Sequence, residues 1–278
     1  EDHGLKYSKF AHHNAISLTS ATFYGANLFD ENSFYLDRHS NWYGQQRWTN
    51  TRPFSCRTYW QQDGLPTDSP EKGRRYVLSS VLAVIGPKAS SKEQALEQIT
   101  RSANADGSKP EGIFYFASTP DPRSKTRVRQ FANTAIKLKD LGYQANVGTQ
   151  AVPRNARVIG ATLGKAKHDW PSSGSEFAPG AFCSNFTSYG GWWAQADRQT
   201  QLSHFLNHGA AGATGTVYEP YTIPSKITTS DTHVHYALGC TLVESIYQTV
   251  EHPYQLLVVG DPLCRPFATM PEFIVKGI

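Results

Sequence analysis

The sequence predicts an α/β fold in which a mostly parallel sheet carries helices on both faces, giving three layers. Three observations support this prediction. From about residue 75 onward, apolar runs typical of buried strands alternate with stretches of helical periodicity. The run 256–259 (LLVV) is continuously apolar, as expected of a strand that helices cover on both sides. Residues 234–250 directly before it repeat apolar side chains at the i, i+4, i+8 spacing of a helix.

The first elements alternate between strand and helix. Residues 76–85 are apolar and end at a Gly-Pro pair, which predicts a strand. Ser90 and Glu93 have the spacing of a capping box, with Ser90 as N-cap of a helix that continues toward residue 104. A strand is predicted at 113–117, and a helix then follows with its apolar face and its terminating glycine at Val128, Phe131, Ala135, Leu138 and Gly142. With a strand at 143–147, the order is the β-α-β-α-β of a parallel sheet.

The alternation continues with longer connections. Strands are predicted at 157–163 and 180–186, separated by a loop rich in Pro, Ser and Gly. A helix marked by Leu202, Phe205 and Leu206 ends at Gly209, and a strand follows at 213–218. The helix over 234–250 is closed by Pro253, and the last strand ends at the turn 260–262 (GDP).

Residues 1–74 differ from the rest and are predicted to form an irregular, aromatic-rich segment before the α/β domain of residues 75–278. Three tryptophans, Trp42, Trp48 and Trp60, are spread among polar turn residues. Exposed rings would suit a sugar-binding surface. The favoured alternative is that these rings cover the core of the main domain or contact a missing partner segment.

The composition limits the classes of function. The 278-residue chain has a net charge of only +4, and its basic residues are interspersed with acids, which argues against nucleic acid as a partner. No apolar run approaches the roughly 20 residues that span a bilayer. The sequence has no cofactor or metal motif, and its cysteines, which lack C-x-x-C spacing, are equally compatible with disulfides and free thiols: Cys56, Cys183, Cys240 and Cys264. Because the chain begins at Glu1 without a Met, we expect a processed product whose targeting segment has been removed.

Candidate site residues follow the predicted strands. If all strands run parallel, Ser188, Glu219 and Asp261 lie at one edge of the sheet, where open α/β sheets bind ligands. His168, in the loop after 157–163, would join them. Cys183 could then form a Cys–His pair with His168, or Ser188 could act as the nucleophile. The alternative is that Cys183 is a small buried hydrophobe and the polar groups only stabilise turns.

From about Arg75 to its last residue, the chain resembles a known family. The resemblance lies in the segments ADGSKPEGIFYF (105–116), FTSYGG (186–191), GAAGATGTVYEPYTIPSK (209–226), HVHYALGC (233–240) and YQLLVVGDPLCRPF (254–267). They are similar to an uncharacterised family of exported bacterial proteins found with exosortase, the membrane protein that processes PEP-CTERM surface proteins. Members usually carry a signal peptide and further sequence before the equivalent of residue 1. The resemblance implies an exported protein of the periplasm, cell surface or extracellular space.

A more remote resemblance concerns the strand and GDP turn at 256–262, which is similar to the end of gingipain-type cysteine peptidases and implies a caspase-like fold. Those peptidases place His-Gly after one strand and Cys at the end of the next. Here His168 is followed by Asp169, and Cys183 precedes the strand end. We therefore expect a non-catalytic binding or structural component of a surface assembly, with protein partners or its own missing N-terminal region. The alternative is a cysteine-peptidase-like hydrolase.

Overall fold

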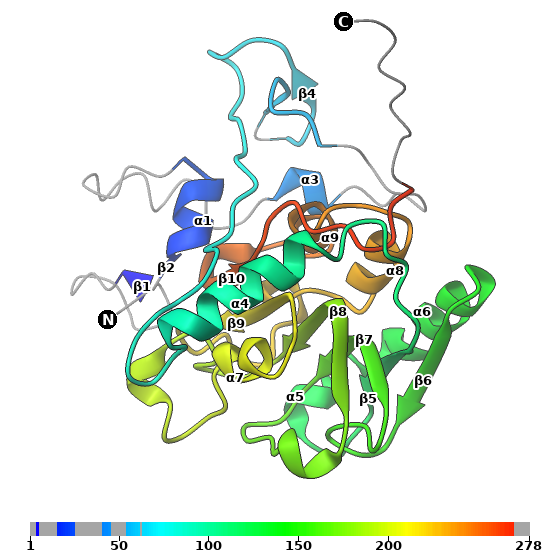
Figure 1. Ribbon diagram of the computed structural model, residues 1–278. Coiled ribbons are helices and arrows are strands. Elements are labelled where there is room, and N and C mark those ends of the chain that lie inside the picture. The colour runs from blue at the N-terminus through cyan, green and yellow to red at the C-terminus, as the bar shows by residue number, and fades with distance from the viewer. Residues whose placement is uncertain (1–3, 6–15, 26–40, 46–53, 62, 270–278) are drawn as a thin grey trace, which may run out of the picture.

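The computed structural model describes residues 4–5, 16–25, 41–45, 54–61 and 63–269 (Figure 1). The strands are β1 (Gly4–Leu5), β2 (Ile16–Ser17), β3 (Tyr59–Trp60), β4 (Pro66–Thr67), β5 (Ile113–Ala117), β6 (Gln144–Gly148), β7 (Arg157–Leu163), β8 (Glu176–Asn185), β9 (Gly212–Thr216) and β10 (Leu256–Gly260). The α-helices are α1 (Leu18–Phe23), α3 (Trp42–Gln45), α4 (Lys92–Ala103), α5 (Pro122–Lys125), α6 (Val128–Asp140), α7 (Leu202–Asn207), α8 (Thr232–Ala237) and α9 (Leu242–Tyr247). Short 3-10 helices are formed by Pro171–Ser173, Trp193–Gln195, Pro224–Lys226 and Pro253–Gln255.

The main sheet has six strands in the order β10-β9-β8-β7-β5-β6. Neighbouring strands from β9 to β6 pair in parallel, and only β10 runs antiparallel to its neighbour β9. This confirms the predicted mixed α/β fold with a mostly parallel sheet. The order reverses at β5, because the chain goes outward to β6 and then returns to β7 on the other side of β5.

The two faces of the sheet belong to two hydrophobic cores. Along β5, Phe114 and Phe116 point into one core and Tyr115 and Ala117 into the other, the alternation that a strand requires. The first core also contains the apolar faces of α1, α6, α8 and α9. The second contains α7 and two buried tryptophans, Trp170 and Trp193. The connection between β6 and β7 holds no helix, so part of this second face is covered by loops.

The predicted strand at 76–85 was wrong. In this segment Val81 forms an isolated bridge to Val259, and its N–H and C=O bond to β10. Tyr76 and Val84 are buried, but Val77, Leu82 and Ile85 are half exposed, so the segment as a whole does not lie between two layers of helices. Residues 76–85 form an irregular extended segment along β10, and composition alone does not distinguish such a segment from a buried strand.

The helix predicted over 234–250 is two helices, α8 and α9. Gly239 has a positive φ of 93°, a conformation that ends α8 and that glycine adopts without steric cost. Thr241 and Glu244 then form a capping box that begins α9. His233 and His235 both lie on α8. At α4 the N-cap is Ser91 rather than Ser90, because the Ser90 hydroxyl donates to Asn207 Oδ1 at 2.7 Å.

The described parts of the N-terminal segment contribute to the first core. Phe23 lies between the stacked rings of Tyr76 and Tyr247, with centroids 4.5 Å away on each side. The Ser17 hydroxyl donates to the carbonyl of Leu256 in β10 at 2.6 Å. Trp60 is buried as well, whereas Trp48 lies outside the described residues. The boundary near residue 75 stays a prediction.

Candidate functional site

The loops that follow β5 to β9 meet at one edge of the sheet, called here the carboxyl edge. Asp261 does not lie there. β10 runs antiparallel to β9, and its last residue, Gly260, pairs with Gly212, the first residue of β9. Asp261 is thus at the opposite edge, where its carboxylate accepts the N–H of Leu263 at 3.0 Å and stabilises a turn.

Arg127 holds the carboxyl ends of β7 and β8 together. Its side chain is 3% exposed and donates to the carbonyl oxygens of Leu163, Ser184 and Thr228 and to the Ser184 hydroxyl. No carboxylate forms an ion pair with Arg127 within the described part of the chain. Burial lowers the pKa of this guanidinium to about 9. Arg127 therefore acts as a buried cation that satisfies strand-end carbonyls.

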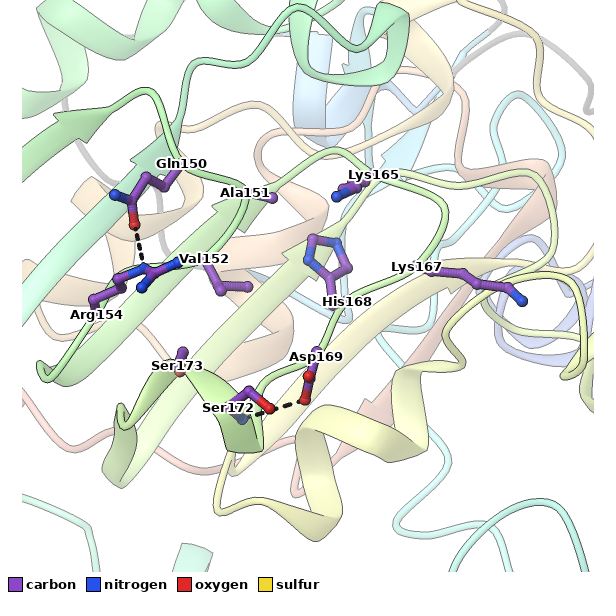
Figure 2. Close-up of a pocket in the computed structure, with 10 residues that line it drawn as sticks. All are labelled: Gln150, Ala151, Val152, Arg154, Lys165, Lys167, His168, Asp169, Ser172 and Ser173. Atoms are coloured by element: carbon purple, nitrogen blue, oxygen red, sulfur yellow. Dashed lines mark hydrogen bonds between the residues drawn. The ribbon is translucent and has the colours of Figure 1, made fainter.

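The first cavity at this edge, called here the basic pocket, has a volume of about 450 Å³ (Figure 2). It is lined by Gln150, Ala151, Val152 and Arg154 from the loop after β6 and by Lys165, Lys167, His168, Asp169, Ser172 and Ser173 from the loop after β7. The lining contains three cationic side chains and one carboxylate. A hydrogen bond from the Ser172 side chain lowers the pKa of the Asp169 carboxyl, and the Ser172 N–H, which donates to the carboxylate at 3.2 Å, lowers it further. The pocket is therefore suited to an anionic group.

His168 lies among the labelled residues at the centre of Figure 2, and its ring is fixed from two sides. Its Nε2 lies 3.0 Å from Asn185 Oδ1, and its ring packs against Phe205. The Asn185 amide donates to Lys165 O and accepts from Lys165 N, so Oδ1 is the acceptor toward His168 and Nε2 carries the proton. Burial lowers the pKa of His168 to about 4, so the imidazole is neutral near pH 7. Its Nδ1 has no hydrogen-bond partner among the described residues.

Cys183 is not at the strand end. Its side chain is fully buried in the second core, and burial raises the pKa of the thiol well above its ordinary value. Asn185, two residues later in β8, is the residue that meets His168. Two residues of a strand span about 7 Å, so the Cys183 thiol lies about that far along β8 from Asn185, the residue that faces the imidazole. The arrangement gives neither an activated thiolate nor a Cys–His pair.

Ser188 and Glu219 both line a second cavity of about 330 Å³, called here the serine pocket. It is lined by Pro122 and Arg123 of α5, by Phe186, Thr187 and Ser188 after β8, and by Glu219, Pro220, Tyr221 and Thr222 after β9. The Glu219 carboxylate accepts the N–H of Tyr221, which has a left-handed φ of 56°. The described lining includes no histidine, since His168 lines the basic pocket instead. His168 therefore lies in one pocket and Ser188 and Glu219 in another, although the sequence had predicted that all three share one site.

Sequence reasoning missed Asn185 and Arg127. Asn185 shares a strand face with Cys183 by the period of two, and it is the last residue of β8, so alternation could have indicated it. Arg127 precedes α6 with no distinguishing motif, and its partners are 36 to 101 residues away in sequence. Such contacts carry no local signal.

Neither a metal centre nor a spanning helix is found in the described residues. No group of three His, Cys, Asp or Glu side chains there could hold a metal ion. None of the helices in the described ranges is both long and apolar enough to cross a bilayer. All four cysteines are free thiols. Comparisons with models of protein families, with curated proteins and with solved structures gave no significant match for this chain.

Proposed function

We propose that this chain is a non-catalytic binding or structural component of an exported envelope or cell-surface assembly, built on a caspase-like α/β fold. The observation that carries the proposal is the contact between His168 and Asn185. In the peptidases that the chain remotely resembles, the His and the nucleophile follow adjacent strands. Here β7 and β8 are adjacent and parallel, His168 follows β7, and the side chain opposite it is an amide. An amide fixes the imidazole but cannot attack a carbonyl carbon as a thiolate would.

The state of Cys183 supports the same function. A reactive thiol needs a lowered pKa and access to solvent, and Cys183 has a raised pKa and no exposed surface. Placement in the envelope rests on the resemblance of the segments between residues 105 and 267 to the exosortase-associated family.

The proposal can be tested with a thiol-directed peptidyl ketone and intact-mass measurement of the native chain. We expect no rapid labelling of Cys183, whereas the exposed Cys56 should react with a small reagent such as iodoacetamide. The Cys56→Ala and Cys183→Ala variants assign any added mass. Stoichiometric labelling by the ketone that disappears only in Cys183→Ala would reject the non-catalytic function.

A hydrolase at the serine pocket is the second candidate, because Ser188 and Glu219 line one cavity. Its test is labelling by a fluorophosphonate, with Ser188→Ala as the matched variant. Labelling of the native chain that Ser188→Ala abolishes would favour this candidate over the first.

A further inference from the structure

Strand β6 forms one edge of the main sheet, and none of the described residues pairs with its outer side. Within the described residues, β5 is its only paired neighbour, and Figure 1 shows β6 as the outermost strand on that side. Its sequence, QANVG, contains no charged residue and no proline, and Val147 is 44% exposed. Edge strands usually carry charges, prolines or bulges that block pairing with another chain. β6 has none of these, so its free N–H and C=O groups can accept a further strand.

A groove over β5 and β6 lies next to the basic pocket. It has a volume of about 620 Å³ and is lined by residues of β5 and β6 and by the loop that follows β6. Gln150 and Arg154 line both the groove and the basic pocket, so the two cavities adjoin. The Tyr115 hydroxyl donates to the carbonyl of Gln150 at 2.8 Å, which ties the loop to β5.

The basic pocket offers free donors at the end of this groove. Arg154 Nε donates to Gln150 Oε1 at 3.1 Å, and the terminal guanidinium nitrogens have no partner among the described residues. Lys165 and Lys167 are exposed and form no ion pair within the described ranges. With His168 neutral, three positive groups and one carboxylate give the pocket a net charge of +2. A carboxylate can be held there by the Arg154 fork and a lysine.

We propose that β6 and the basic pocket together bind an extended acidic peptide of a partner protein. The peptide adds a strand to β6, and an Asp or Glu side chain or a terminal carboxylate enters the basic pocket. Main-chain hydrogen bonds to the edge supply affinity without sequence preference, and the carboxylate in the pocket supplies specificity. Charge complementarity favours an acidic peptide over a second copy of this chain, whose β6 carries no acidic residue. The inference rests on the proposed binding function and identifies the class of partner.

The test uses the whole chain and fluorescence anisotropy of a labelled peptide, Thr-Val-Thr-Val-Thr-Glu-Glu. Two probes are matched to it: one with Gln in place of both Glu, and one with N-methyl groups on alternate residues, which cannot pair with a strand edge. We expect the Gln and N-methylated probes to bind about tenfold more weakly or worse. Arg154→Gln and Lys165→Gln should weaken the Glu probe about tenfold and leave the Gln probe unchanged.

The matched protein control is Lys139→Gln, an exposed lysine on α6, whose apolar face packs in the first core. If Lys139→Gln weakens binding of the Glu probe as much as Lys165→Gln does, the effect comes from the overall charge of the protein and not from the pocket, and the proposal is overturned. Equal binding of the N-methylated probe, binding of inorganic phosphate alone, or a dimer in sedimentation that the peptide does not dissociate would also overturn it. Mass analysis of the recovered peptide separates the two proposals. Intact but unbound peptide rejects only the peptide site, and cleaved peptide rejects the non-catalytic function.

Discussion

Replacing Arg127 with methionine should destabilise the protein by about 2–4 kcal/mol. The change removes the Arg127 donor from the carbonyl oxygens of Leu163, Ser184 and Thr228. The Leu163 carbonyl still accepts the N–H of Phe186 at 3.0 Å, so the loss is concentrated at the Ser184 and Thr228 carbonyls. Each buried acceptor left unsatisfied costs about 1–3 kcal/mol. Relief from burying a cation without a carboxylate partner offsets several kcal/mol of that cost. The balance remains unfavourable because methionine brings no donor to the strand ends.

The assay is urea unfolding at pH 7, monitored by tryptophan fluorescence. The shift in the urea midpoint gives the change in the free energy of unfolding, provided that the dependence of this free energy on urea concentration is the same in both proteins. Arg127→Lys should not rescue stability, since an ammonium lacks the planar fork that reaches several carbonyls at once. The control is Arg123→Met, four residues earlier, where a partly exposed ion pair to Asp121 at 3.3 Å is expected to contribute under about 1 kcal/mol. A loss at Arg127 no larger than that at Arg123 would refute the role assigned to the buried guanidinium.

Three further predictions test the core and the site. Burial lowers the pKa of His233 from 6.5 to about 3, so below pH 6.5 the imidazole takes up a proton in the unfolded chain but not in the folded one, and stability falls. Between pH 6.5 and 4, the free energy of unfolding should fall about 1.4 kcal/mol per pH unit more steeply in the native chain than in His233→Phe. Parallel curves for the two proteins would contradict this. Gly160→Ala would place a methyl group 2.6 Å from His233 Nδ1 and should cost about 1–3 kcal/mol in urea unfolding, whereas Gly86→Ala, with nothing within 4 Å, should be close to neutral. Asn185→Cys places a thiol next to His168, whose Nε2 now lies 3.0 Å from Asn185 Oδ1, so its alkylation should be faster than that of any native buried thiol. An inert thiol would mean that the imidazole is held elsewhere.

The local features of the fold could be predicted from the sequence. The strands at 113–117 and 157–163 and the helix with the face Val128 to Leu138 agree with the structure, because periods of 2 and 3.6 report which side of an element is buried. The same periods misled where an apolar segment lay along the outside of a strand, as at 76–85, and where a glycine divided a predicted helix in two, as at Gly239.

The direction of β10, the separation of His168 from Ser188 and the pairing of His168 with Asn185 were decided only by the tertiary structure. The predicted convergence assumed that every strand ran parallel, and one antiparallel strand places Asp261 at the far edge. Composition and periodicity describe the environment of each residue along its own element. Strand direction and the meeting of side chains depend on contacts between distant segments, and those contacts are selected by the packing of the whole core.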